Sequence, residues 1–170
     1  MFCTECHIPL ALQGEKRKRE GILLKDLLLQ GGMNVVVAGT FDVLHPGHLY
    51  LLEEAAKLGD VYVIIARDCN IRTTKKEKKI VFTEDERLRM MQGLKPVKKA
   101  ILGDKNDFFN PIEEISPDYI LLGPDQDEEW VRSEVEKRDL DTEVKRLPER
   151  LPYSSSEIRH RLGCTDADSV

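Results

Sequence analysis

The chain has 170 residues, of which 41% are hydrophobic and 34% are charged, a composition typical of a globular domain. Its formal net charge of -5 argues against nonspecific binding to nucleic acid. No apolar run is long enough to span a bilayer, and the N-terminus lacks the apolar stretch of a secretory signal. We therefore expect a cytoplasmic protein with reduced cysteines and no membrane partner.

The first part of the chain differs in composition from the rest. It combines a cysteine-rich start with the charge run GEKRKREG and a leucine-rich stretch. We expect residues 1–32 to be an N-terminal appendage that could be mobile. Residues 33–163 are expected to form the main domain, and residues 164–170 a C-terminal tail.

Strand and helix patterns alternate from Met33 onward. Apolar runs predict buried strands at residues 33–38, 61–66, 97–102, 118–123 and 143–147. Helical spacing and end signals predict helices at residues 46–58, 83–94, 110–115, 127–138 and 154–162, with a basic loop at residues 67–82. Thr83 can cap the second helix together with Glu86. This alternation predicts an α/β fold, a doubly wound parallel sheet in a Rossmann-like three-layer α/β/α sandwich.

Ligands of such sheets bind beyond the carboxyl ends of the strands, where the strand order reverses. This rule selects four loops as candidate binding segments. They are residues 39–46, 67–82, 123–127 and 148–154.

The first of these loops contains the sequence GTFDVLHPGH, from Gly39 to His48. Gly39 allows the backbone to pass close to a ligand, and Pro46 suits the first turn of a helix, whose free amides attract an anion. His45 and His48 are one helical turn apart, so both imidazoles can face that anion. Packing alone is one alternative, and zinc is another, but zinc would require a third ligand. We predict that the two histidines bind phosphate.

Cys3, Cys6 and His7 have the spacing of a zinc half-site and also of a c-type haem attachment. No second pair of ligands follows them, and the sequence shows no export signal. We therefore predict no metal-binding residues in this chain.

GTFDVLHPGH, with its HxGH core, resembles the signature of the nucleotidylyltransferase superfamily, whose members transfer AMP or CMP from a nucleoside triphosphate to a phosphate or related acceptor. YSSSEIR, from Tyr153 to Arg159, resembles a second family element, a Ser/Thr-rich turn that opens the last helix. ARDCNI, KKEKKIVFTEDER, LKPVKKAILGD and PDYILLGPDQ resemble the archaeal-type FAD synthases, which are FMN adenylyltransferases. The similarity covers about residues 33–162.

The resemblance implies transfer of AMP from ATP to FMN, giving FAD and pyrophosphate. It also implies a divalent cation such as Mg²⁺ with ATP, and a homodimer. His45 and His48 would be the catalytic residues. The resemblance and the loop positions together predict a nucleotide site formed by Thr40, Phe41, His45, Pro46, Gly47, His48, Lys76, Arg87, Asp125, Tyr153, Ser155, Ser156 and Arg159.

Several of these predicted site residues also have an alternative role. Lys76 and Arg87 can hold the β- and γ-phosphates or belong to a solvated charged surface. Asp125 can accept a hydrogen bond from ribose or adenine, or cap the helix that follows it. The serine-rich motif is also similar to that of glycerol-phosphate cytidylyltransferases. The alternative functions are therefore CMP transfer to glycerol 3-phosphate or a similar polyol phosphate, AMP transfer to phosphopantetheine, and a noncatalytic nucleotide-binding sensory module.

Overall fold

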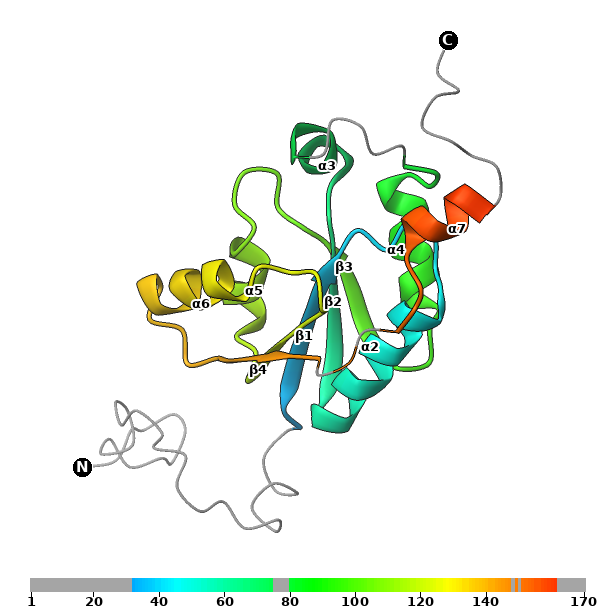
Figure 1. Cartoon of the computed structure of the whole chain (residues 1–170). Helices are drawn as coiled ribbons and strands as arrows, with labels where there is room; N and C mark the ends of the chain where they lie inside the picture. Colours follow the sequence, from blue (N-terminus) through cyan, green and yellow to red (C-terminus); the bar gives the residue numbers. More distant parts are fainter. Residues whose placement is uncertain (1–31, 75–79, 148, 150, 162–170) are drawn as a thin grey trace, which may run out of the picture. The chain divides into compact units, whose positions relative to one another are not determined.

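The computed structural model describes residues 32–74, 80–147, 149 and 151–161. Its centre is a parallel sheet with the strand order β3-β2-β1-β4-β5 (Figure 1). The strands are β1 (Asn34–Gly39), β2 (Asp60–Ile65), β3 (Val97–Leu102), β4 (Tyr119–Leu122) and β5 (Glu143–Arg146). The helices are α2 (Pro46–Leu58), α3 (Asp68–Thr74), α4 (Glu84–Gln92), α5 (Asn110–Ile115), α6 (Glu128–Lys137) and α7 (Ser155–Arg161). Each predicted strand is confirmed.

Helices cover both faces of the sheet, with α2 and α4 on one side and α5 and α6 on the other (Figure 1). Successive residues of a strand point to opposite faces, and β1 shows this directly. Val35 packs in a cluster with Leu52 of α2, whereas its neighbour Val36 packs in a second cluster with Ile112 of α5. The predicted three-layer α/β/α architecture is therefore confirmed.

The strand order reverses beside β1. The chain runs from β1 outward to β2 and β3, and then returns to place β4 and β5 on the other side of β1. Parallel sheets bind ligands beyond the carboxyl ends of the strands at such a reversal. In this molecule the reversal lies between β1 and β4, which are directly paired.

Local signals account for the starts of two helices. Pro46 occupies the first turn of α2, as expected, where its missing N–H leaves no hydrogen bond unmade. The capping box predicted for α4 is confirmed. The backbone N–H of Glu86 donates to Oγ1 of Thr83 (3.4 Å), and the backbone N–H of Thr83 donates to Oε2 of Glu86 (2.9 Å). This helix ends at Gln92, two residues before the predicted end.

The prediction of a loop over residues 67–82 is wrong for its first part, because Asp68–Thr74 form helix α3. The starts of α3 and α4 cap one another. The N–H of Asp68 donates to Oε2 of Glu84 (2.8 Å), and the N–H of Glu84 donates to Oδ2 of Asp68 (3.3 Å). These partners are 16 residues apart, so a reading based on neighbouring residues missed the cap.

Several predictions concern residues outside the described part of the chain. These are the appendage apart from Gly32, the tail at residues 164–170, and the possible metal ligands Cys3, Cys6 and His7. Within the described ranges, no helix combines the length and the apolar character that a membrane span requires.

Candidate active site

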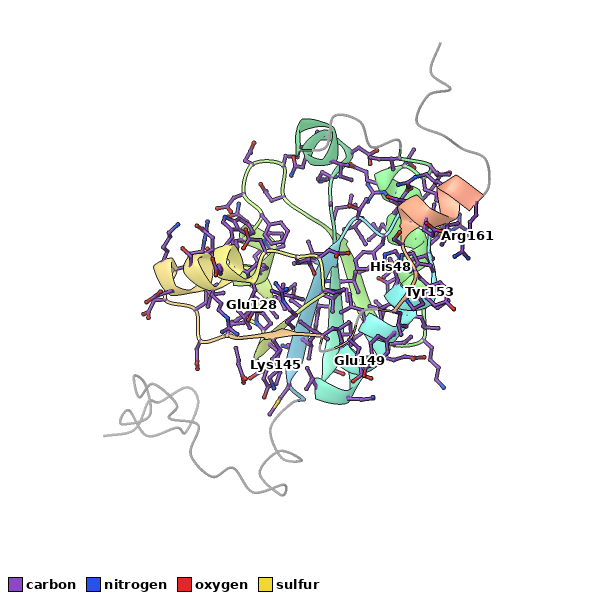
Figure 2. The ribbon with its side chains drawn as sticks, in the orientation of Figure 1. His48, Glu128, Lys145, Glu149, Tyr153 and Arg161 are labelled. Carbon is purple, nitrogen blue, oxygen red and sulfur yellow. The ribbon has the colours of Figure 1, made fainter. Side chains whose placement is uncertain are left out.

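A cavity of about 410 Å³ lies at the reversal point, and three segments line it. They are the loop after β1 with the start of α2, the loop after β4, and the segment from β5 to α7. The first contributes the predicted residues Thr40, Phe41, His45, Gly47 and His48. The other two contribute Asp125, Tyr153, Ser155 and Ser156. Figure 2 shows His48 and Tyr153 close together near the starts of α2 and α7.

The two histidines of the HxGH core form a stacked pair at the start of α2. Their ring centroids are 3.7 Å apart with an angle of 21° between the planes, and the ring of Phe41 meets His48 edge-on at 5.1 Å. Burial lowers the pKa of His45, so this imidazole is neutral at pH 7 before any ligand binds. Its Nδ1 atom is buried and has no hydrogen-bond partner among the described residues. The pair is therefore placed to donate hydrogen bonds to the oxygens of an anion, and His45 can take up a proton when the anion binds.

Phe41 holds this loop in an unusual backbone conformation. Its φ angle is 50°, and its side chain is buried. A Cβ atom added to Gly39 would lie 2.9 Å from the Phe41 ring, so glycine is required there to make room for the ring. The sequence predicts that Gly39 allows close approach of a ligand. The structure shows that it also makes room for the ring of Phe41.

The serine-rich start of α7 lies against the histidine loop. Oγ of Ser155 donates to the carbonyl of Val43 (3.2 Å), which precedes His45 by two residues. Oγ of Ser154 accepts from the N–H of Glu157 (3.1 Å) and so caps the helix. The hydroxyls of the Ser/Thr-rich turn and the two imidazoles therefore share one cavity, although they are more than a hundred residues apart in the sequence.

The family model described as Cytidylyltransferase-like matches residues 36–161, which include both motifs and all of the cavity lining. The chain belongs to the cytidylyltransferase-like family. The FAD synthase of Ferroglobus placidus is 53% identical to it over 116 residues, which are 66% of this chain and 74% of that protein. The FAD synthase of Methanoculleus marisnigri is 52% identical over 136 residues, 76% of this chain and 89% of that protein.

A solved structure is also similar to this cytidylyltransferase-like chain. It is the lipopolysaccharide core biosynthesis protein from Thermoplasma volcanium, with 36% identity and a TM-score of 0.66. The match covers 71% of this chain and all of the other. The family matches confirm the predicted membership of the nucleotidylyltransferase superfamily and the likeness to archaeal FAD synthases.

Arg87 does not occupy the place that was predicted for it in this cytidylyltransferase-like domain. It is fully buried, outside the cavity lining. Its guanidinium donates to the carbonyl oxygens of Thr40 (2.6 Å), Ala66 (2.9 Å) and Phe82 (3.1 Å), and also to the carboxylate of Asp68. These acceptors engage all three of its nitrogens. Arg87 therefore supports the loops after β1 and β2 instead of contacting the β- and γ-phosphates.

Arg159 and Pro46 also lie outside the cavity lining. Arg159 is 9% exposed and donates to Oδ2 of Asp42 (3.2 Å) and to Oγ of Ser156 (3.4 Å). The guanidinium of Arg159 is therefore bound by protein groups, and the residue does not line the cavity. Pro46 is exposed at the start of α2, and Lys76 lies outside the described residues.

The loop after β4 carries Asp125 into the cavity lining. The alternative reading of this residue as a helix cap is wrong, because Asp127 caps α6 by accepting from the N–H of Trp130 (3.0 Å). Gln126 fixes the loop against β1. Its Oε1 accepts from the N–H of Gly123 (2.7 Å), and its Nε2 donates to the carbonyl of Ala38 (3.2 Å).

The sequence reading missed several residues of this site. Gln126, Glu149 and Leu151 line the cavity. They fall within the predicted binding loops at residues 123–127 and 148–154, but no motif singled them out. Asp42 also lines it and is fully buried. A signal for Asp42 was available, since an acidic residue inside an otherwise apolar and aromatic stretch, TFDVL, requires partners if it is buried.

Proposed function

We propose that the chain is an FAD synthase, which transfers AMP from ATP to the phosphate of FMN and releases pyrophosphate. The observation that carries this proposal is the stacked pair of His45 and His48 at the start of α2, inside a cavity that also contains the start of α7. The relatives named FAD synthase support FMN as the acceptor.

The reaction is an in-line displacement at phosphorus. A phosphate oxygen of FMN forms a bond to the α-phosphorus of ATP, while the bond from that phosphorus to the bridging oxygen of the β-phosphate breaks. The electron pair of the broken bond leaves with pyrophosphate, and no covalent intermediate with the protein is required. Catalysis then depends on positioning and on donors that stabilise the charge on the phosphoryl oxygens.

The chain offers such donors from two segments that line the cavity. Imidazole N–H groups of His45 and His48 come from the first, together with the amides of the first turn of α2, which favour an anion. The hydroxyl of Ser156 comes from the second, whereas the hydroxyl of Ser155 donates to the carbonyl of Val43 and holds this segment against the histidine loop. Asp125 also lines the cavity, where its carboxylate would accept from a ribose hydroxyl or an adenine amine.

A divalent cation such as Mg²⁺ is expected to accompany ATP. Among the described residues, no group of three or more His, Cys, Asp or Glu side chains is arranged to hold a metal ion. The cavity lining does include the carboxylates of Asp125 and Glu149. Mg²⁺ keeps several waters and binds phosphate oxygens, so this donor set fits an ion carried by the triphosphate. Its contribution would be to neutralise charge on the phosphate oxygens.

The decisive experiment measures pyrophosphate release with ATP or CTP against FMN, glycerol 3-phosphate and phosphopantetheine. FMN-dependent release with ATP, and FAD as the product, is the expected result. Release only with CTP and glycerol 3-phosphate would replace the proposal with a cytidylyltransferase, and release only with phosphopantetheine would indicate a different adenylyltransferase. No release with any pair would favour a noncatalytic nucleotide-binding module.

ATP and FMN are the small-molecule partners under this proposal, and neither nucleic acid nor a membrane takes part. The resemblance to the family further implies a homodimer. Light scattering of the purified chain tests this prediction. A monomeric mass at the concentration of the activity assay would contradict it.

The affinity for ATP is expected to depend on pH through His45. Burial lowers the pKa of His45 in the free protein, and a bound triphosphate raises it again, so binding takes up a proton between the two pKa values. The affinity should therefore increase as the pH falls through this range, by up to about tenfold per pH unit for one proton. Calorimetry between about pH 5.5 and about pH 8 measures the slope.

The variant His45→Gln is the control for this pH dependence, because ATP itself titrates equally with both proteins. The wild-type slope should exceed that of the variant. Equal slopes would show that His45 does not take up the proton.

Substitution of Gly47 by alanine is expected to lower kcat about tenfold without loss of stability. The added Cβ would lie 3.0 Å from Nδ1 and 3.1 Å from Cε1 of His45, so the imidazole must shift by a few tenths of an ångström. Alanine also favours a helix more than glycine does. Turnover and thermal unfolding measure the two effects. Gly93→Ala, whose Cβ would have no neighbour closer than 3.5 Å, is the control, and equal turnover of the two variants would contradict the prediction.

A further inference from the structure

Asp42 is a fully buried carboxylate within the histidine loop, three residues before His45. Its Oδ1 accepts from the backbone N–H groups of Val81 (2.9 Å) and Phe82 (3.0 Å). Its Oδ2 accepts from Nη1 of Arg159 (3.2 Å). One side chain thus joins the loop after β1 to the segment that enters α4 and to helix α7.

The contacts of Asp42 lead to two serines of the cavity lining. Arg159 donates in turn to Oγ of Ser156, and Ser155 donates to the carbonyl of Val43, the residue next to Asp42. Both serines line the cavity. The start of α7 is therefore attached to the histidine loop at two adjacent residues, Asp42 and Val43.

Arg87 also joins the loop after β1 to the segment before α4. It donates to the carbonyl oxygens of Phe82 and Thr40, while Asp42 accepts from the N–H of Phe82. Both polar groups of the Phe82 backbone are thus bound by buried ionic side chains. The segment before α4 is held rigidly against the loop that carries the histidines.

The chemistry of Asp42 argues for positioning over direct catalysis. A buried carboxylate is costly unless it is paired and hydrogen-bonded, and stability alone would be met as well by apolar packing. Its two oxygens already accept from three protein donors, and the side chain is fully buried. Although Asp42 borders the cavity, its carboxylate is engaged by protein partners, which favours a positioning role over that of a base.

We propose that Asp42 is a positioning residue, which through Arg159 fixes the serine-rich start of α7 relative to His45 and His48. This inference rests on the proposed function, because it assigns both groups to one phosphoryl transfer. Donors that must meet the same transition state lose effect steeply when their separation changes.

The test compares Asp42→Asn, Arg159→Gln and the double variant with the wild type, under conditions where each is folded. We expect Asp42→Asn to lower kcat at least about tenfold while the Kd for ATP rises less than about threefold. Arg159→Gln should have a similar effect, and the double variant should be no slower than the slower single variant, because both changes break one connection. Arg159→Lys should recover part of the loss.

The ion pair of Asp107 and Arg138, which is more exposed, is the control. Arg138 donates to both oxygens of Asp107 (3.0 and 3.1 Å) across 31 residues of sequence, and neither residue lines the cavity. Asp107→Asn should lower the Tm but leave kcat unchanged. A kcat of Asp42→Asn within about twofold of the wild type, additive losses in the double variant, or an equal loss of kcat in Asp107→Asn would each overturn the inference.

Hydrogen exchange separates this inference from the proposed function. Asp42→Asn should accelerate amide exchange in residues 155–159 of α7, with α6 unchanged. If the wild type fails to release pyrophosphate with ATP and FMN, the proposed function fails. Amide exchange in α7 still measures whether Asp42 holds this helix against the histidine loop. Unchanged exchange in α7 would overturn the positioning role whatever the substrates are.

Discussion

Replacement of His48 by alanine is expected to lower kcat by about 10²- to 10³-fold, the usual loss when one preorganised donor to a transition-state oxyanion is removed. His48 stacks on His45 with 3.7 Å between the ring centroids and meets the edge of the Phe41 ring. Its side chain is only half-buried, so alanine should not prevent folding. Pyrophosphate release with ATP and FMN measures the loss, and thermal unfolding checks that the variant is folded.

Two further variants sharpen this test. Leu49→Ala changes the next residue of the same helix, whose side chain is 43% exposed and does not line the cavity, and should leave kcat unchanged. His48→Asn retains a hydrogen-bond donor near the position of Nδ1 but cannot carry a positive charge. Partial recovery in His48→Asn would indicate that donation matters more than charge. A folded His48→Ala enzyme with turnover within about threefold of the wild type would remove His48 from the catalytic residues.

Arg87→Met is expected to have the largest effect on stability. The substitution removes a fully buried guanidinium and leaves three partly buried backbone carbonyl groups and the Asp68 carboxylate without this donor. Loss of one partner from such a network lowers the free energy of unfolding by about 3–5 kcal/mol. Chemical denaturation measures this loss, and the Tm should fall by at least about 10 °C.

The control for this variant is Arg161→Met, at an exposed guanidinium that pairs with Glu157 one helical turn away. Exposed pairs of this kind contribute little, so its unfolding curve should match that of the wild type. Arg87→Lys should lie between the two, because one ammonium cannot replace the fork of the guanidinium. An Arg87→Met protein as stable as the wild type would show that the network is not required for the fold.

The regular elements were predictable because their signals are local. Helix α2 has the predicted bounds, Pro46–Leu58, since proline marks its first turn and apolar residues recur at helical spacing. Strand β3, Val97–Leu102, also has its predicted bounds. Helix α3 was missed, because its cap depends on Glu84, a residue 16 positions further along the chain. Local patterns cannot report a partner that only folding brings near.

The same distinction applies to the site. His45 and His48 were predicted because one motif places both at a strand-to-helix junction, and the structure stacks them in the cavity. Arg87 was predicted to bind phosphate because it lies on the helix that follows the basic loop. Its actual acceptors, the carbonyl oxygens of Thr40 and Ala66, belong to loops after two different strands. A charge pattern does not distinguish a solvated guanidinium from one buried among carbonyls.

The sequence by itself determined the class of sheet, the position of the histidine motif and the type of reaction, because each depends on residues that are neighbours in the chain. Only the tertiary structure decided which charged groups face the cavity and which support it. Asp42, Arg87 and Arg159 are all buried or nearly so, and each is bonded to segments far away in the sequence. A buried charge must be paired within the protein, and it is then no longer a free contact for a ligand. Whether a charge is buried is a property of the folded chain.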